Sequence, residues 1–326
     1  MNVDFLIVGQ GICGSILALT IERAGYSYCI VDENKEITSS KVAGGIMHPV
    51  SFKRCILNWR GEEFFKFSSD FYKEINSLFN SNDFNKIDLI RVFNSFEEQN
   101  NWIAKSAHQP LKSILDSCRY ELESISTPYD YGSVNWCARL NLLSFIKNSK
   151  KHFLDKKCLL INKFVLQNIK VNNSDIKYDN INAKHLIFCQ GADGIENELF
   201  NYLPLIPNKG ELLTVKSKTL PNLMVSKKVF SFPLGNQHFT IGATYDHIDR
   251  SANTTKKAHK ELMSQLEKIT PTNKMKVINQ KYGFRPTTID RRPLIGEHPL
   301  IKKFYIFNGM GSKGVLMTPL LAKEFL

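Results

Sequence analysis

The sequence predicts an α/β fold in which a Rossmann-type domain with a parallel sheet is interleaved with an antiparallel, β-rich domain. An apolar run at residues 5–8 leads into a glycine-rich turn at residues 9–14, and helical periodicity follows it. Between residues 210 and 245 the pattern changes to short strands separated by prolines and by Gly235-Asn236. A strand and a helix pattern return after residue 300, so we expect the chain to visit each domain more than once.

The expected elements follow from hydrophobic periodicity and turn residues. Strands are expected at residues 5–8, 28–31, 91–93, 159–161, 165–171, 176–178, 185–189, 211–215, 229–232, 239–243 and 304–307. Helices are expected at residues 14–24, 59–79, 97–105, 140–150, 255–269 and 315–325. The three strands between 159 and 178 are expected to form a small antiparallel set, and Thr254 or Thr255 is the expected N-cap of the 255–269 helix.

The composition is that of a globular protein with an excess of positive charge. The chain has 326 residues, enough for two cores, and 43% of them are hydrophobic. The 43 Lys and Arg exceed the 31 Asp and Glu and give a net charge of +12. Dispersed lysines on a solvated surface explain this charge, and a polyanionic partner such as tRNA also stays open. The longest apolar runs have strand length, so we expect no membrane partner, and no basic segment of a signal peptide precedes Asp4.

The seven cysteines are odd in number and scattered: Cys13, Cys29, Cys55, Cys118, Cys137, Cys158 and Cys189. No pair has the CxxC spacing, which disfavours a disulfide framework and a zinc site, so no metal is predicted. Cysteine usage of this kind favours a reducing compartment, and a cytoplasmic location is expected. Cys13, Cys29 and Cys189 have apolar neighbours and are expected to be small buried residues.

The turn Gly9-Gln10-Gly11-Ile12-Cys13-Gly14 predicts a dinucleotide site. Its first glycine permits the tight turn, its second allows the pyrophosphate to approach the backbone, and its third allows the helix to pack on the strand. The helix N-terminus offers N–H groups and positive potential to phosphate. Asp32, 18 residues after Gly14, is placed to accept ribose hydroxyls, which favours FAD or NAD over NADP. A purely structural turn is the alternative.

Further motifs follow this turn in a fixed order. They are Ser39-Ser40-Lys41-Val42-Ala43-Gly44-Gly45-Ile46, Cys189-Gln190-Gly191-Ala192, Gly283-Phe284-Arg285-Pro286 with residues up to 296, and Phe307-Asn308-Gly309-Met310-Gly311-Ser312-Lys313-Gly314. Together with Asp32 they make the chain resemble the D-amino acid oxidase/glycine oxidase (DAO) family of FAD-dependent enzymes over nearly its whole length. The tail with Pro319 also resembles the flavin domain of the bifunctional enzyme that processes 5-carboxymethylaminomethyl-uridine in tRNA.

The resemblance implies a glutathione-reductase-like FAD fold of the DAO type. It implies an FAD-binding domain at residues 1–58, 140–205 and 284–326, and a discontinuous substrate domain at 59–139 and 206–283. The residues implied to bind FAD are Gly9, Gln10, Gly11, Ile12, Cys13, Gly14, Asp32, Glu33, Ser40, Ala43, Gly44, Gly45, Ile46, Val165, Cys189, Gly191, Ala192, Gly311, Ser312, Lys313, Gly314 and Val315.

Two basic residues are implied to serve the reaction. By resemblance, an amine is oxidised at its Cα–N bond, a hydride equivalent passes to flavin N5, and Lys313 is the cation near the flavin N1/C2=O edge. Arg285 is implied to bind the substrate carboxylate, a task that suits a guanidinium. The alternatives are a surface position for Lys313 and a structural ion pair of Arg285 with Asp290 or Glu297.

The sequence gives weaker support for a functional role of other residues near these motifs. His48 follows the flavin loop and is considered as a base, although the resembled enzymes do not generally need one. Trp136, Tyr245 and Tyr282 are considered as pocket or core residues, and Arg291-Arg292 as a turn.

Three functions stay open at this point. The leading hypothesis is an FAD-dependent oxidoreductase that oxidises the CH–NH bond of a small amino acid or N-substituted amine to an imine, with oxygen or another acceptor taking the electrons. The second is a tRNA-modifying flavoenzyme that removes a carboxymethyl group from a wobble uridine. The third is a flavoprotein without catalytic activity.

Overall fold

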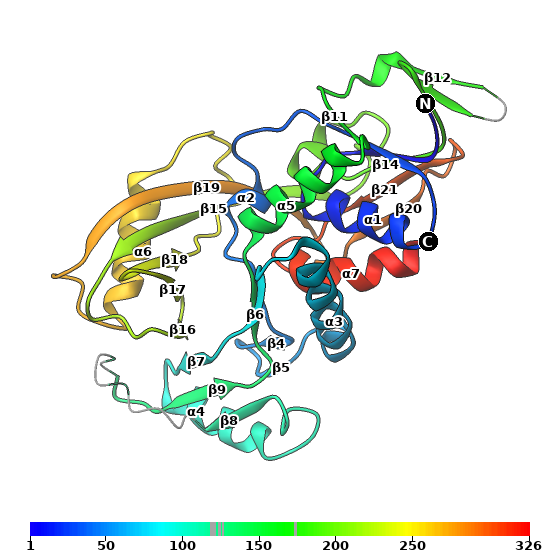
Figure 1. Cartoon of the computed structure of the whole chain (residues 1–326). Coiled ribbons are helices and arrows are strands. Elements are labelled where there is room, and N and C mark those ends of the chain that lie inside the picture. Colours follow the sequence, from blue (N-terminus) through cyan, green and yellow to red (C-terminus); the bar gives the residue numbers. More distant parts are fainter. Residues whose placement is uncertain (118–121, 123–124, 126, 173–174) are drawn as a thin grey trace.

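The structure is a computed structural model that describes residues 1–117, 122, 125, 127–172 and 175–326. Its described residues form two eight-stranded sheets with helices packed around them (Figure 1). Shorter elements join the sheets: α2 (Ser39–Val42), β3 (Ile46–Met47), β4 (Val50–Ser51), β5 (Ile56–Leu57), β6 (Phe84–Lys86), β10 (Ala138–Leu140) and the 3₁₀ turns η1 (Leu166–Asn168) and η2 (Gly191–Glu196).

The first sheet contains the predicted βαβ unit. Its strands are β1 (Asn2–Val8), β2 (Tyr28–Asp32), β11 (Leu159–Ile161), β12 (Ile169–Val171), β13 (Ile176–Tyr178), β14 (Ile181–Phe188), β20 (Leu294–Glu297) and β21 (Phe304–Asn308). Strands β11, β2, β1, β14 and β21 are parallel neighbours in that order. Their carboxyl ends therefore lie along one edge of the sheet, where ligands of such folds bind.

Helices cover one face of this sheet, and two of them come from opposite ends of the chain. They are α1 (Ile12–Arg23), α3 (Gly61–Phe79), α5 (Leu142–Asp155) and α7 (Gly314–Phe325), and their apolar sides form one hydrophobic core with the sheet. Helix α7 packs against both α1 and α3. A second core on the opposite face includes Leu6, Phe188 and Phe200. The first and last parts of the described chain are thus neighbours in space (Figure 1).

The second sheet is mostly antiparallel and carries α4 (Phe96–Ser106) and α6 (Lys256–Glu267). Its strands are, in spatial order, β19 (Lys276–Thr288), β15 (Leu205–Lys216), β18 (His238–Gly242), β17 (Phe230–Gly235), β16 (Met224–Ser226), β7 (Leu89–Val92), β9 (Tyr131–Val134) and β8 (Leu115–Ser117). One pair, β16 with β7, is parallel.

The two longest strands, β15 and β19, connect the sheets. They pair from Leu205 opposite Thr288 to Lys216 opposite Lys276, and a bulge after Thr214 shifts the register once. One end of this ladder lies beside the first sheet and the other forms the edge of the second sheet (Figure 1). Any residue on the ladder is therefore fixed relative to both sheets.

Two of the expected segments differ from the structure, and one long strand was not expected. The 159–161 strand pairs in parallel with β2, so it extends the main sheet and is not part of an antiparallel set. The 165–171 segment is a 3₁₀ turn followed by a three-residue strand. Strand β19 was not predicted, because polar residues dominate its first half. Thr255 is the N-cap of α6 and accepts the Ala258 N–H at 3.1 Å. The domain boundaries remain a prediction.

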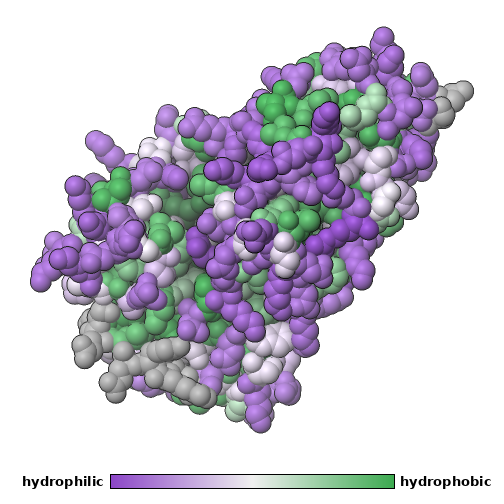
Figure 2. Space-filling model, viewed as in Figure 1, coloured by the Kyte–Doolittle hydropathy of each residue, from purple (hydrophilic) through white to green (hydrophobic). Residues whose placement is uncertain are grey.

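The surface is mostly hydrophilic on the face shown in Figure 2, with hydrophobic residues in separate patches. None of the helices in the described part of the chain is long and apolar enough to cross a membrane. Six of the seven cysteines are free thiols, and Cys118 lies outside the described residues.

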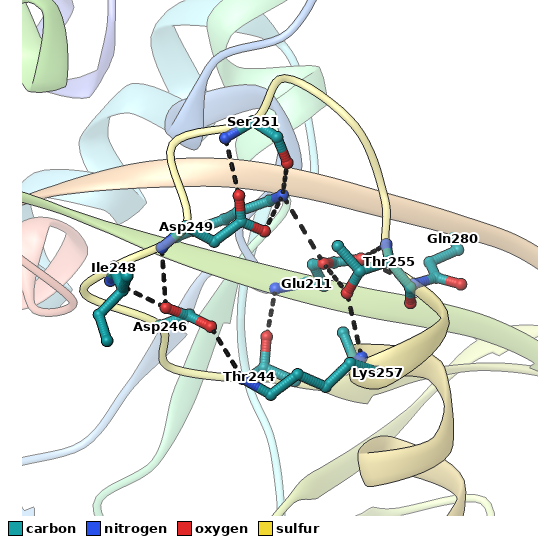
Figure 3. A network of polar contacts seen from close by, with 11 residues as sticks. Glu211, Thr244, Asp246, Ile248, Asp249, Ser251, Thr255, Lys257 and Gln280 are labelled. Carbon is teal, nitrogen blue, oxygen red and sulfur yellow. Dashed lines mark hydrogen bonds and ion pairs between the residues drawn. The ribbon is translucent and has the colours of Figure 1, made fainter.

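A buried ionic network holds the loop at residues 244–255 against β15 (Figure 3). The Lys209 Nζ lies 2.7 Å from the Asp249 carboxylate, and Glu211 accepts the Thr255 N–H at 2.9 Å. The Lys209 and Glu211 side chains are 1% and 3% exposed. Buried charges of this kind are stable only when they are paired, so the network fixes the loop to the strand.

Replacing Lys209 tests this role. In Lys209→Met, Glu211 stays buried without its cation, and we expect the free energy of unfolding to fall by about 3 kcal/mol. The matched control is Lys257→Met, because Lys257 is 81% exposed and pairs with Asp246 at the surface. Urea unfolding measures both variants. Equal midpoints for the two variants would show that the network does not stabilise the fold.

Candidate functional site

Two adjoining cavities lie at the carboxyl edge of the first sheet. The larger has a volume of about 650 Å³ and is lined by the ends of β1, β2 and β14 and by the segment at residues 163–167. The smaller has a volume of about 160 Å³ and lies between residues 42–46, the β19 strand and the loop before α7. Ser39, Ser40 and Gly283 line both cavities. The two spaces therefore form one elongated site.

The glycine-rich turn forms the floor of the larger cavity. Gly9 has a φ of +102°, and a Cβ there would lie 2.6 Å from the Cys189 carbonyl oxygen. A Cβ at Gly14 would overlap the Gly9 carbonyl oxygen. Only glycine fits at either position. Because these residues lack a Cβ, α1 packs closely against β1 and its N-terminus lies at the cavity.

The start of α1 presents N–H groups to the same space. Gly11 occupies the N-cap position and provides no side-chain cap. The Ser40 hydroxyl accepts the Ile12 N–H at 3.0 Å. The first-turn N–H groups and the helix dipole together favour an anionic ligand at this end of the helix.

Asp32 lies at the end of β2 in the wall of the larger cavity. Its two carboxylate oxygens accept the backbone N–H groups of Gln10 and Asn34, each at 2.7 Å. Each oxygen retains a second lone pair that is able to accept a hydroxyl. The adjacent Glu33 forms an ion pair with Lys35 at 3.0 Å.

The two glycine-rich segments from opposite ends of the sequence meet at this site, where Ile12 and Gly314 both line the smaller cavity. The Asn308 side-chain amide donates to the Gly191 carbonyl at 2.8 Å, which connects the turn after β21 to the turn after β14. The Gly311 N–H donates to the Pro286 carbonyl at 2.9 Å, which connects the loop before α7 to β19. These bonds hold the loop at residues 309–313 beside the smaller cavity.

Most residues that were predicted to bind the cofactor lie in the walls of the two cavities. They are Gly9, Gln10, Gly11, Ile12, Asp32, Glu33, Ser40, Ala43, Gly44, Gly45, Ile46, Val165, Cys189, Gly191, Ala192, Gly311, Ser312, Gly314 and Val315. Gly14 and Cys13 lie behind the wall, and burial raises the pKa of the Cys13 thiol to about 12. The Val165 N–H donates to the Tyr178 hydroxyl at 3.2 Å.

Arg285 extends from β19 into the wall of the smaller cavity. Its Nη1 donates to the Asn208 side-chain oxygen at 2.8 Å and to the Thr244 carbonyl at 3.1 Å. The Tyr245 ring lies 4.1 Å from the guanidinium carbon. A Cβ at Gly210 would overlap the guanidinium, so the arginine occupies space that only a glycine leaves open.

The guanidinium of Arg285 has no acidic partner among the described residues. Burial lowers its pKa, because the charged group is removed from water. The alternative ion pairs are not formed: Asp290 accepts the Arg292 N–H at 3.0 Å, and Glu297 pairs with Lys302 at 3.2 Å. The positive charge of Arg285 is therefore available to a ligand.

Lys313 is the N-cap residue of α7 and is half-buried. Burial of its amine lowers its pKa to about 8, and the positive charge acts on Cys137 and His48. The side chain is therefore only partly removed from water. Neither cavity wall contains the Lys313 side chain, so its contact with a cofactor remains a prediction.

The other residues considered for the site, His48, Tyr245, Tyr282 and Trp136, lie at different positions. Burial and the charge of Lys313 lower the pKa of His48 well below its usual value, so the imidazole is neutral near pH 7. Tyr245 lines the smaller cavity and Tyr282 the larger one. Trp136 stacks on Phe65 with ring centroids 5.5 Å apart and belongs to the core.

One basic residue near the smaller cavity was not predicted from the sequence. Arg139, on β10, donates its Nε–H to the Gly44 carbonyl at 3.2 Å. Its guanidinium carbon lies 4.3 Å from the Phe232 ring centroid. An arginine between Ala138 and Leu140 in an apolar stretch was the available signal, but no motif marks it.

Comparison with known families identifies the chain. A family model described as FAD dependent oxidoreductase (DAO) matches residues 4–325. The chain belongs to this family. It is therefore an FAD-dependent oxidoreductase, which confirms the predicted family, enzyme class and cofactor.

Solved structures of other proteins share the fold of this DAO family member and confirm the predicted architecture. A glycine oxidase from Bacillus cereus superposes with a TM-score of 0.82 at 17% identity, covering 99% of this chain and 93% of the other. An L-proline dehydrogenase from P. horikoshii gives a TM-score of 0.82 at 13% identity, covering 99% and 92%. At these identities the likeness concerns the fold.

The curated relatives that match the chain are longer proteins. A tRNA 5-methylaminomethyl-2-thiouridine biosynthesis bifunctional protein from Campylobacter jejuni subsp. doylei is 23% identical over 307 residues. The match covers 90% of this chain and 46% of that relative, so the chain spans about half the length of the protein it matches.

The residues of the two cavities fit FAD. The larger cavity combines a turn without Cβ atoms, a helix N-terminus and the Asp32 carboxylate, which suit a diphosphate and a ribose. The smaller cavity has glycines and apolar side chains in its wall, which suit a flat ring system. We therefore propose that the adenosine diphosphate part occupies the larger cavity and the flavin ring the smaller one.

The low pKa of Lys313 predicts a pH-dependent stability of the FAD-free protein. The pKa is about 8 in the folded state and 10.5 in the unfolded chain, so between these values the unfolded chain binds more protons and stability rises with pH. Below pH 8 both states carry the charge and the cost of its burial is complete. We expect Lys313→Met to be more stable than the native chain by roughly 2 kcal/mol at pH 7, with the difference shrinking toward pH 10.

Urea unfolding of the two apoproteins at pH 7 and pH 9.5 measures this effect. Lys323→Met on the exposed side of α7 is the matched control and should show no such pH-dependent difference. A constant offset between Lys313→Met and the native chain at both pH values would contradict the expected titration.

Proposed function

We propose that this FAD-dependent oxidoreductase oxidises the CH–NH bond of a small amino acid or N-substituted glycine. The observation that supports this substrate class is the half-buried guanidinium of Arg285 in the wall of the smaller cavity, which has no acidic partner among the described residues. A planar guanidinium binds a carboxylate through two parallel N–H donors. The carboxylate of an amino acid would balance the positive charge of this half-buried arginine.

The surroundings of Arg285 favour binding in one orientation. Its Nη1 is already committed to Asn208 and Thr244, so the remaining donors are directed by these bonds. Tyr245 covers the guanidinium, and the ionic network of Lys209 holds the loop that carries this tyrosine. A substrate carboxylate bound here would place its Cα–N bond at a fixed distance from the cavity wall.

Bound FAD supplies the two-electron oxidant for this reaction. The substrate loses the electron pair and hydrogen of its C–H bond together with the amine proton, and the resulting C=N bond is hydrolysed by water to a carbonyl compound and an amine. The chain contributes the carboxylate anchor, an apolar wall from Leu212, Phe230 and Ala243, and the positive charge of Lys313 near the loop at residues 309–313. Oxygen or another acceptor completes the cycle.

A series at Arg285 tests the carboxylate anchor. We expect Arg285→Ala and Arg285→Gln to lower kcat/KM for the carboxylate substrate by roughly 100-fold or more, since a buried charge-assisted contact is lost. Arg285→Lys keeps the charge but not the paired donors and should be intermediate. The measurement is the rate of anaerobic flavin bleaching with glycine, sarcosine and proline, preceded by a check that the purified variants retain the flavin absorbance.

Two outcomes decide this proposal. Bleaching by one of these amines that depends on Arg285 supports it. A native enzyme that no amino acid or N-alkyl glycine reduces, or an Arg285→Ala variant with native turnover and bound flavin, would remove the proposal. Arg23→Gln, a change in a surface ion pair with Glu74, is the matched control and should behave as the native enzyme.

A second candidate function is the processing of a modified uridine in tRNA. The curated relatives with this role in their names match 90% of the chain, and the positive net charge suits a polyanion. A carboxymethylamino group on a uridine has the same N-substituted glycine unit that Arg285 would bind. Analysis of wobble nucleosides in a deletion strain separates the two candidates: accumulation of the carboxymethyl form would favour tRNA.

The non-catalytic alternative is set aside, because the chain belongs to a family of oxidoreductases.

A further inference from the structure

Asn208 is a buried amide on β15 that contacts the guanidinium of Arg285. It is 0% exposed and lies directly opposite Arg285 in the β15–β19 ladder. Its side-chain oxygen accepts the Arg285 Nη1–H at 2.8 Å. Its Nδ2 is also buried and has no hydrogen-bond partner among the described residues. One half of this amide therefore holds the guanidinium, whereas the other half binds no described group.

The other contacts of the guanidinium limit where a ligand reaches it. The Thr244 carbonyl accepts the same Nη1 at 3.1 Å. The Tyr245 ring lies 4.1 Å from the guanidinium carbon, and a Cβ at Gly210 would overlap Nη2. Neither Nε nor Nη2 of Arg285 has an acceptor among the described residues. These two donors lie on one edge of the guanidinium and are the pair that binds a carboxylate side-on.

The two groups that fix Nη1 of Arg285 carry no charge. An amide oxygen and a backbone carbonyl orient a guanidinium without neutralising it. Aspartate has the same shape as asparagine and would form a stronger, charge-assisted bond from the same position. The chain has such a pair elsewhere, because Arg91 lies 2.6 Å from Glu98 and the two side chains are 8% and 19% exposed. Arg285 thus differs from Arg91 in the charge of the group that holds it.

We propose that Asn208 is a positioning residue, whose neutral amide orients Arg285 and leaves its positive charge to the substrate carboxylate. This inference rests on the proposed function, in which Arg285 binds that carboxylate. An acid at position 208 would compete with the ligand, because two anions would then share one cation and repel each other. The unpartnered Nδ2 permits this exchange, since an oxygen in its place breaks no hydrogen bond.

The variant Asn208→Asp, which keeps the shape of the side chain, tests this role. Methylthioacetate is a carboxylate with sulfur in place of the amine, so it binds without CH–NH oxidation. We expect Asn208→Asp holoenzyme to bind it roughly 10- to 100-fold more weakly than the native holoenzyme. The new ion pair should also raise the midpoint of thermal unfolding without ligand by roughly 2 to 4 °C. Titration of the flavin absorbance and a thermal scan give the two values.

Anaerobic flavin reduction separates the charge of Arg285 from its orientation. The substrate is whichever of glycine, sarcosine and proline bleaches the native enzyme. In Asn208→Asp the half-saturating concentration should rise by roughly 10- to 100-fold, while the limiting rate changes by less than about threefold. Asn208→Ala leaves the charge available but releases the orientation, so it should lower the limiting rate more than the affinity.

The matched control is Asn279→Asp. Asn279 is an exposed residue of the same strand as Arg285, so this variant gains the same charge away from the guanidinium. Its affinity for methylthioacetate and its unfolding midpoint should both equal the native values.

The outcomes distinguish this inference from the proposed function. Native affinity for methylthioacetate in Asn208→Asp, or a weaker affinity together with a lowered unfolding midpoint, overturns the role of Asn208 while amino-acid oxidation still stands. Binding that Asn208→Asp loses as expected, in an enzyme that no amine reduces, supports the role of Asn208 and removes the proposed oxidation. A native holoenzyme that does not bind methylthioacetate overturns this inference together with the carboxylate anchor.

Discussion

The β15–β19 ladder is the constraint on which the site depends. Its antiparallel register fixes Arg285 opposite Asn208 and close to Gly210, and the missing side chain of this glycine makes room for the guanidinium. The same ladder places Gly283 against the start of α2 and Pro286 against the loop before α7. The glycine-rich motifs and the smaller cavity are therefore held at a fixed distance by backbone hydrogen bonds, which do not depend on side-chain identity.

The guanidinium of Arg285 in the wall of the smaller cavity carries a positive charge that no acidic group among the described residues neutralises. Arg285 has neutral partners, which are the Asn208 side chain, the Thr244 carbonyl and the Tyr245 ring. Elsewhere the chain pairs its buried charges, as in Lys209 with Asp249 and Arg91 with Glu98. A cation that is removed from water without an acidic partner lowers the stability of a protein, so the position of Arg285 in the cavity wall supports the proposed binding of an anionic group there.

The sequence predicted those features that depend on neighbouring residues. Strand, glycine turn, helix and acidic residue are consecutive from Asn2 to Asp32, so the βαβ unit followed from local pattern alone. Strand β19 did not, because residues 276–281 are mostly polar and are stabilised by pairing with β15. Arg285 was found through a motif, whereas the contacts of Arg139 with Gly44 and Phe232 join residues that are far apart in the sequence. The parallel pairing of β11 likewise depends on a partner more than 120 residues away.

The neighbouring positions of the first and last elements have a consequence for synthesis on the ribosome. β1 pairs with β2 soon after both emerge, but its other neighbour β14 is made much later, and α1 is covered by α7 only after residues 314–325 have appeared. For most of translation the apolar residues of α1, such as Ile16 and Leu17, lack their final cover. The apolar side of α1 therefore stays partly uncovered in the nascent chain until almost all of the described residues have been synthesised. We expect the yield of the protein in a cell to depend on chaperones that bind such apolar surfaces.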